Sequence, residues 1–192
     1  KFPPGQWVKL FTKPEDLPAD LSKPDSGVTW EDGWIRFEVK PVKMIDIPGE
    51  LQKNYAIRCR YKRDPATGHS AGLVLRSGRD GEGQPGFYSF DLSPKQELLI
   101  KRKQSGPQGD SYPTIFIAKA TEAELTQPEE VIEFGAVGDH LVARLGRSFV
   151  KLVSAPHLRQ GKGYIAGGGA SAIRDIEVIN LDGLPEAEAL RL

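Results

Sequence analysis

The stretch Tyr55-Ala56-Ile57-Arg58-Cys59-Arg60-Tyr61-Lys62 contains the pattern that decides the fold. Apolar or aromatic side chains occupy every odd position, and basic side chains occupy positions 58, 60 and 62. Successive side chains of a β-strand point to opposite faces, so this alternation predicts a strand with one buried face and one exposed face. The odd positions are therefore assigned to a core and the basic positions to a surface.

The same alternation recurs along the chain and is interrupted by 21 glycines and 15 prolines. Further strands are expected at residues 34–39, 73–76, 87–92, 97–102, 114–119, 131–134, 140–145, 149–153, 164–166 and 173–181. Roughly ten to twelve short strands with turn signals between them are typical of an all-β sandwich or barrel with antiparallel neighbours. Shared parity predicts a core that contains Ile57, Cys59, Tyr61, Leu73, Leu75, Tyr88 and Phe90.

Length and charge limit the classes of protein to be considered. A chain of 192 residues suits one domain over 1–192, with a short helix or the start of a linker at 185–192. Lysine plus arginine equals aspartate plus glutamate, at 26 each, so no net field attracts nucleic acid or an anionic membrane. No apolar run approaches the roughly 20 residues of a spanning helix. We therefore expect no nucleic-acid partner and no direct membrane insertion.

The single cysteine, Cys59, cannot form a disulfide within the chain. The localisation stays open, because large extracytoplasmic domains, periplasmic or at the cell envelope, also fold without disulfides. The chain begins at Lys1 rather than Met, which is expected of a processed protein or of one domain of a longer protein. A signal or an anchor upstream of Lys1 is compatible with that expectation.

Four short motifs follow one another in a recognisable order. They are Trp7-Val8-Lys9-Leu10-Phe11, Trp30-Glu31-Asp32-Gly33-Trp34-Ile35, Gly68-His69-Ser70-Ala71-Gly72-Leu73-Val74-Leu75-Arg76, and Gly161-Lys162-Gly163-Tyr164-Ile165-Ala166 followed by the strand Ala172 to Val178. In this order they resemble the concanavalin A-like lectin/glucanase superfamily, and within it the 3-keto-disaccharide hydrolase-like domains of bacteria. The sequence departs from that pattern at His69, where asparagine is usual, and in having one extra residue before Gly72.

The resemblance implies a two-sheet antiparallel jelly-roll sandwich of the concanavalin A-like type. It also implies one of two functions. The first is a non-catalytic binding or interaction module, glycan-binding and part of a larger bacterial protein. The second is a glycoside hydrolase similar to the 3-keto-disaccharide hydrolases.

Glycosidases usually need two carboxyl groups at a defined separation. The sequence lacks the tight run of alternating acids found in laminarinase-like members of the superfamily. The nearest candidates are the acids of 129–133, expected at a solvated strand edge, and Asp175 with Glu177 on one predicted strand. If the protein is an enzyme, Asp91, Asp175 or Glu177 acts as acid or base, and Arg76 orients the substrate.

No cofactor is expected from the motifs. The three histidines, at 69, 140 and 157, lack the spacing of zinc ligands. Calcium is the alternative, with Asp80 and Glu82 of the glycine-rich loop 78–86 as ligands. Cys59 falls on the apolar face of its strand and is interpreted as a small core residue rather than a nucleophile.

A candidate binding surface follows from strand parity. If the strands after residue 62 pair as a meander, the outer face that carries Arg58, Arg60 and Lys62 also carries Arg76, Ser89, Asp91, Glu97 and Lys101. Arginine forks and carboxylates suit bidentate contacts to hydroxyls or acidic sugars, and Trp34 or Phe87 could stack on a sugar ring. The predicted ligand-binding residues are Arg58, Arg60, Arg76 and Asp91. The alternative is a solvated cross-strand ladder of arginines and carboxylates.

The leading hypothesis is therefore a binding module that holds a carbohydrate or another polar ligand across a concave sheet. The glycoside hydrolase stays the alternative. A domain that binds only other proteins cannot be separated from the first hypothesis by sequence.

Overall fold

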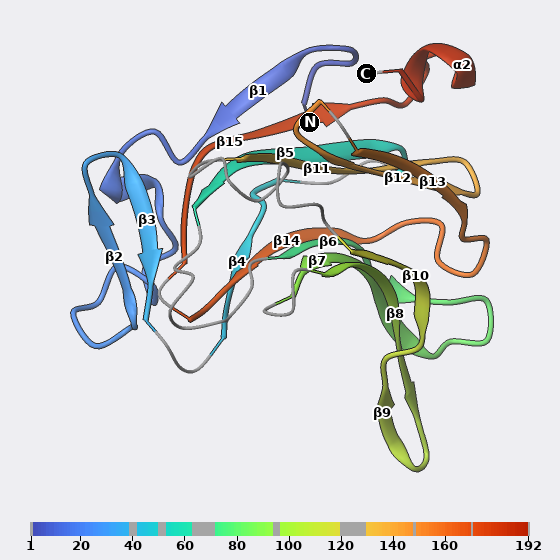
Figure 1. The fold of residues 1–192 in the computed structure, drawn as a ribbon, viewed down its shortest axis with the longest axis horizontal. Coiled ribbons are helices and arrows are strands. Elements are labelled where there is room, and N and C mark those ends of the chain that lie inside the picture. The colour runs from blue at the N-terminus through green and yellow to red at the C-terminus, as the bar shows by residue number, and fades with distance from the viewer. Residues whose placement is uncertain are drawn as a thin grey trace.

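The structure is a computed structural model that describes residues 2–38, 42–49, 53–62, 72–93, 97–119, 130–147, 149–169 and 171–191. Nearly all regular structure in these ranges is β-strand, arranged in two antiparallel sheets that pack face to face (Figure 1). The predicted all-β, two-sheet antiparallel sandwich is confirmed. Residues 68–71, which include His69, and Glu129 lie outside the described residues.

Eight of the described strands form sheet A. In spatial order they are β13 (Phe149–Ser154), β12 (His140–Leu145), β11 (Glu130–Val137), β5 (Tyr55–Lys62), β15 (Ala172–Asn180), β3 (Trp34–Phe37) and β2 (Val28–Glu31), with β1 (Trp7–Leu10) paired to β15.

Seven of the described strands form sheet B. In spatial order they are β10 (Thr114–Lys119), β8 (Glu97–Gly106), β7 (Pro85–Leu92), β6 (Gly72–Arg79), β14 (Lys162–Gly167) and β4 (Lys43–Asp46), with β9 (Gly109–Ser111) paired to β8. The helices of the described ranges are the 3-10 turn η1 (Pro14–Asp16) and α2 (Glu186–Ala189). Neither has the length or the apolar character needed to cross a membrane.

Four described strands lie outside the ranges expected from alternation, namely β1, β2, β4 and β9. No strand was expected between residues 102 and 114, and this is wrong: β8 continues to Gly106 and pairs with β9 in a hairpin. The hairpin projects beyond the sandwich (Figure 1), so neither of its faces meets a core. Without a buried face, a strand has no reason to alternate apolar and polar side chains, and the pattern disappears.

The assumed pairing of β5 is also wrong. β5 lies between β11 and β15 in sheet A, whereas β6, β7 and β8 are neighbours in sheet B. Both sheets of a sandwich bury one face against the same core, so parity shows which side chains are buried but not to which sheet a strand belongs.

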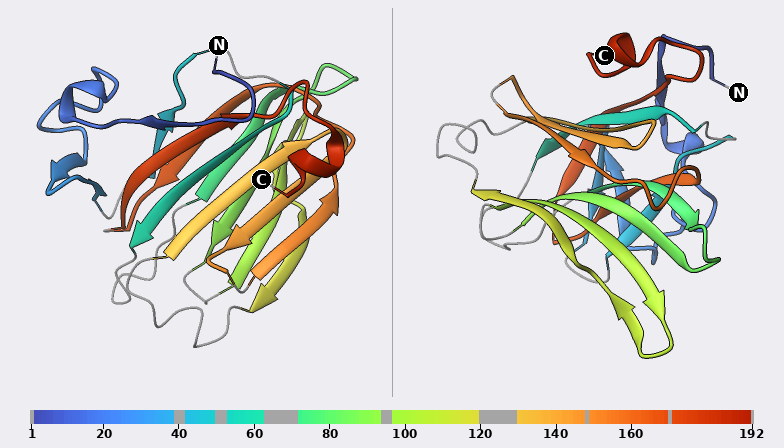
Figure 2. Two further views of the ribbon diagram at one scale, coloured as in Figure 1. Left: turned by 90° about the horizontal axis from the view of Figure 1, so that it is seen from above. Right: turned by 90° about the vertical axis from the view of Figure 1, so that its right-hand side faces the viewer.

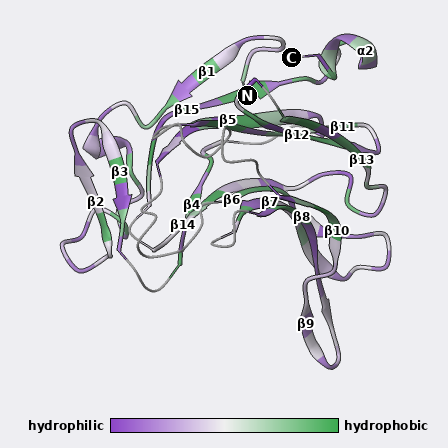
Figure 3. Cartoon of the chain, viewed as in Figure 1, coloured by the Kyte–Doolittle hydropathy of each residue, from purple (hydrophilic) through white to green (hydrophobic). Residues whose placement is uncertain are grey.

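The core lies between the inner faces of the two sheets. All seven side chains predicted for it are buried, with at most 3% of their surface exposed. Phe90 of sheet B packs against two rings of sheet A, with centroid distances of 5.9 Å to Phe134 and 6.4 Å to Phe149. The strongest hydrophobic colouring in Figure 3 accordingly follows the strands of the two facing sheets.

The two sheets differ in curvature. In the right-hand view of Figure 2, sheet B bends away from sheet A toward the β8–β9 hairpin, so its outer face is concave. Carbohydrate or another extended ligand was expected on a face of this shape.

Candidate functional site

The concave face of sheet B is built by strand alternation. Tyr88, Phe90 and Leu92 of β7 belong to the core, so the residues between them, Ser89 and Asp91, point outward, as does Phe87. The strand register places further outward residues beside these. We call the following set the concave face: Met44, Gly72, Val74, Phe87, Ser89, Asp91, Leu99, Lys101, Lys103 and Tyr164.

Asp91 is the acidic group of this face and lies near the C-terminal end of β7. Ser89 Oγ donates a hydrogen bond to Asp91 Oδ2 over 3.0 Å, and Lys101 Nζ lies 3.3 Å from the same oxygen. Burial raises the pKa of the Asp91 carboxyl, although Lys101 and Ser89 act in the opposite direction. An Asp91 carboxylate is therefore a partly desolvated acceptor that is already positioned.

Gly72 makes room for this carboxylate. A Cβ atom at position 72 would lie 2.3 Å from Asp91 Oδ1, which is far inside van der Waals contact. Gly72 and Asp91 are direct cross-strand partners. The absence of a side chain at Gly72 therefore allows the Asp91 carboxylate to pack against the backbone of the neighbouring strand.

A pocket of about 440 Å³ opens at one end of the concave face. Tyr164 and Phe87 belong to the strands on either side of β6, and the β6 residues Ser77 and Gly78 lie between them. We call this cavity the bulge pocket; its lining includes Met44, Gly78, Arg79, Phe87, Lys103 and Tyr164. The Lys103 ammonium lies 5.8 Å from the centre of the Phe87 ring.

The pocket lies where β6 is irregular. The register of β6 with β7 shifts between Leu75 and Gly78, and Arg76 has a φ of 52°. The Arg76 amide donates a hydrogen bond of 2.8 Å to Tyr55 Oη, which fixes the backbone at this point. A β-bulge reverses the direction in which the next side chains point, so Arg76 turns inward.

The inward Arg76 is a structural anchor. Its side chain is almost completely buried, and the guanidinium donates to the carbonyl oxygens of Lys53, Gly138 and Leu158 at 2.7 to 3.3 Å. The outward orientation assumed from sequence is therefore wrong for this residue. Arg76 lies beneath the candidate site and shapes the β6 bulge, which makes it a positioning residue.

Arg58 and Arg60 lie on the outer face of sheet A, across the sandwich from Asp91. Arg58 Nε is 2.6 Å from Glu177 Oε2, and its guanidinium stacks over the Trp7 ring at 3.9 Å. Arg60 Nε lies 3.6 Å from Asp175 Oδ2. This arrangement matches the cross-strand ladder considered as the alternative. The four predicted ligand-binding residues do not share one surface, and a ligand role for Arg58 and Arg60 stays a prediction.

The acids proposed for catalysis are separated in the same way. Asp91 faces outward from sheet B, whereas Asp175 and Glu177 face outward from sheet A, so Asp91 cannot form a pair with either across one glycosidic bond. Glu133 was expected at a solvated edge, and this is wrong. β11 lies between β12 and β5, and Glu133 is 9% exposed and forms an ion pair with Arg144.

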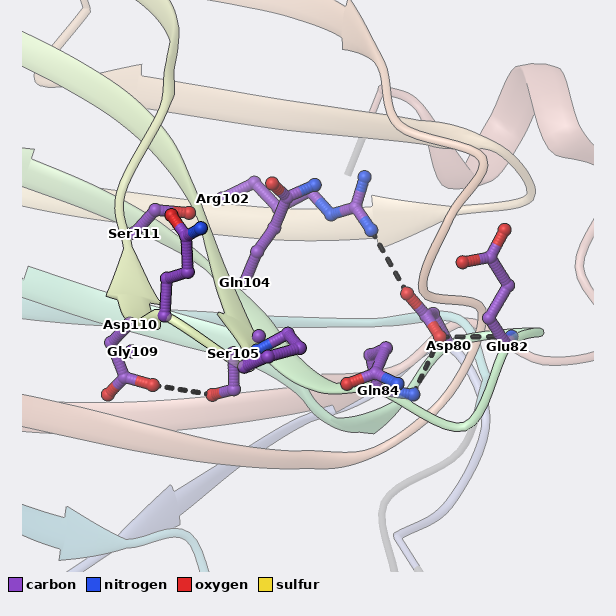
Figure 4. Close-up of a pocket in the computed structure, with 12 residues that line it drawn as sticks. Asp80, Glu82, Gln84, Arg102, Gln104, Ser105, Gly109, Asp110 and Ser111 are labelled. Carbon is purple, nitrogen blue, oxygen red and sulfur yellow. Dashed lines mark hydrogen bonds and ion pairs between the residues drawn. The ribbon is translucent and has the colours of Figure 1, made fainter.

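A second pocket of about 580 Å³ lies between the β6–β7 turn and the β8–β9 hairpin (Figure 4). Asp80 Oδ1 accepts hydrogen bonds from the amides of Glu82 and Gln84, and Oδ2 lies 3.2 Å from Arg102 Nη2. Both amide hydrogen bonds lower the pKa of the Asp80 carboxyl, and the one from Gln84 has the larger effect. The Asp80 carboxylate, which was proposed as a calcium ligand, thus stabilises the turn of which Asp80 is part. The described ranges contain no cluster of three side chains able to hold a metal ion.

Comparison with known proteins establishes the fold. No protein-family model and no curated protein matches the sequence. A carbohydrate binding module, CBM66 from Bacillus subtilis, superposes with a TM-score of 0.55 at 12% identity, over 94% of this chain and 100% of that one. The VIP36 exoplasmic/lumenal domain in its Ca²⁺/Man-bound form gives a TM-score of 0.57 at 10% identity, over 81% of each chain. Sheep galectin-11 gives 0.52 at 12% identity, over 73% of this chain and 99% of that one.

The chain has the β-sandwich fold of these three proteins. This agrees with the concanavalin A-like fold implied by its motifs. The narrower relation to 3-keto-disaccharide hydrolases stays a prediction.

Tyr164, Lys103 and Met44 were not predicted as site residues from the sequence. A strand at 164–166 was expected and is present as part of β14. Its position beside β6 follows only from the three-dimensional pairing, and β4 and the outer part of β8 were not predicted as strands.

Proposed function

We propose that this protein is a non-catalytic saccharide-binding module whose ligand lies across the concave face of sheet B. The observation that carries the proposal is the combination on this face of two outward aromatic rings, Phe87 and Tyr164, with the positioned carboxylate of Asp91. Aromatic rings offer flat apolar contact area to the C–H face of a sugar, and a carboxylate accepts hydrogen bonds from its hydroxyl groups.

The dimensions favour an oligosaccharide. Phe87 and Asp91 are four residues apart on one strand, which corresponds to about 13 Å at the usual rise per residue. The bulge pocket would hold a terminal unit, and the remaining units would extend toward Asp91. Neighbours of the same fold that are described as a carbohydrate binding module and a galectin support this class of ligand. Attachment to a larger bacterial protein stays part of the proposal.

The experiment is a glycan array with the wild-type protein, followed by calorimetric titration of the best-bound oligosaccharide into three variants. Asp91→Asn is expected to weaken binding about tenfold to a hundredfold, because hydrogen bonds to a charged group contribute about 1.5–3 kcal/mol. Gly72→Ala should have a similar effect, since its Cβ displaces the same carboxylate. Asp175→Asn is the matched control, because Asp175 also pairs with a lysine but lies on sheet A.

Equal affinity of Asp91→Asn and the wild type would contradict the proposed site, and an array without any bound saccharide would contradict the proposed function. Release of shorter sugars during the titration would favour the glycoside hydrolase instead.

The affinity should also depend on pH. Burial raises the pKa of Asp91, so on acidification this carboxyl is protonated at a higher pH than an ordinary aspartate. A protonated carboxyl loses acceptor capacity, and binding should therefore weaken as the pH falls through the raised pKa. Titrations in a series of buffers should show this loss of saccharide affinity at acidic pH in the wild type and not in Asp91→Asn. The same loss of affinity in both proteins would mean that another group is responsible.

A further inference from the structure

We infer that the bulge pocket selects an acidic sugar, that is, a saccharide unit carrying a carboxylate or a sulfate. This inference rests on the proposed saccharide-binding function and specifies the chemistry of its terminal unit. Two cationic side chains, Arg79 and Lys103, line the pocket, and its described lining contains no carboxylate. Lys101 of the concave face is paired with Asp91, and Lys103 of the pocket is paired with Asp110. Arg79 instead donates to a main-chain carbonyl, so the positive charge of the pocket that no described carboxylate balances is that of Arg79.

Both cations keep donors for a ligand. The Arg79 Nη1 group donates to the carbonyl oxygen of Gly83 over 2.6 Å, and a guanidinium has five N–H donors. The Lys103 ammonium lies 2.7 Å from Asp110 Oδ2, and an ammonium has three donors. These contacts fix the two side chains at the rim while each retains N–H groups beyond its described partner.

The aromatic residues and the cations together define the orientation of the ligand. A pyranose ring between Phe87 and Tyr164 would present its edge substituents to the surrounding rim, where Arg79 and Lys103 lie. Arginine recognises planar carboxylate or tetrahedral sulfate groups through paired N–H donors, and lysine adds a point charge. A neutral sugar would contact the same rings but would leave both cations without a ligand partner.

The test compares ligands that differ only in charge. Trigalacturonate is titrated beside its fully methyl-esterified form, and a sulfated galactan trisaccharide is titrated beside its desulfated form. The paired acidic and neutral glycans of the array extend the comparison to other sugars. The acidic member of at least one pair should bind about tenfold tighter or more, with an affinity that falls as sodium chloride is added. Preference within the galacturonate pair identifies a carboxylate ligand, and preference within the galactan pair identifies a sulfate.

Two variants connect the preference to the pocket. Arg79→Gln and Lys103→Gln should each reduce the affinity for the acidic member about tenfold more than the affinity for the neutral member, so that the preference within the pair is lost. Lys119→Gln is the control, because Lys119 is an exposed lysine of β10, the strand at the edge of the same sheet. Circular dichroism and the denaturation midpoint verify that each variant is folded.

The possible failures are distinguishable. Neutral saccharides that bind as tightly as their acidic counterparts would overturn this inference and leave the proposed function intact. An acidic preference that persists in both glutamine variants would place the anion elsewhere and would also overturn it. Binding to no saccharide of either kind would overturn the proposed function itself.

Discussion

Truncating Phe90 to alanine should lower the free energy of unfolding by about 3–5 kcal/mol, the usual cost of removing a large aromatic side chain from a core. Phe90 is 2% exposed and connects the two sheets through the rings of Phe134 and Phe149. Alanine would remove the transfer free energy of the ring and leave a cavity that both sheets line. Urea denaturation of the wild type and the variant measures the difference.

Phe87→Ala is the matched control, because Phe87 lies on the same strand with the opposite parity. It should change the unfolding free energy by less than about 1 kcal/mol, as most surface substitutions do, and should weaken saccharide binding. Phe90→Ala with a wild-type midpoint, or Phe87→Ala with the larger loss, would show that the inner and outer faces of β7 are assigned the wrong way round.

Replacing Arg76 with methionine should cost about 3 kcal/mol or more. Methionine retains an apolar stem but has no donor for the three main-chain carbonyls that the guanidinium contacts. A buried acceptor that loses its partner costs about 1–3 kcal/mol. Relief of the desolvated charge offsets part of this loss, since burial also lowers the pKa of Arg76. Arg76→Lys should be destabilising too, because an ammonium cannot span three acceptors as the guanidinium fork does.

Arg79→Met provides the comparison for Arg76, because Arg79 is exposed on the same strand. Its unfolding free energy should stay within about 0.5 kcal/mol of the wild type. If Arg76→Met and Arg79→Met have the same denaturation midpoint, Arg76 does not anchor the β6 bulge.

Most of the fold could be predicted from sequence because it follows from local alternation. The segment 55–62 has an unambiguous period of two, and it forms β5 with the same bounds. The seven core side chains follow from the same rule, since each strand buries one parity. The hairpin of β8 and β9 could not be predicted this way, because a strand exposed on both faces carries no alternation.

The candidate site was predictable only in part, because it depends on pairing between strands far apart in the sequence. Ser89, Asp91 and Lys101 were correctly expected to share an outer face, since β7 and β8 are consecutive neighbours. Arg58 was assigned to the same face because β5 was assumed to pair with β6, whereas it pairs with β11 and β15. Arg76 lies within a bulge, and one inserted residue reverses the parity on which its orientation was inferred.

The central claim is that ligand binds to the outer face of sheet B and not to that of sheet A. The most direct measurement is an amide chemical-shift titration of the isotope-labelled wild-type protein with the best-bound oligosaccharide of the array. We expect the largest shifts at residues 86–91, 99–103 and 164–166, on β7, β8 and β14. Shifts concentrated at residues 58–60, 131–133 and 175–177 would instead locate the ligand on the arginine ladder of sheet A and would contradict this account.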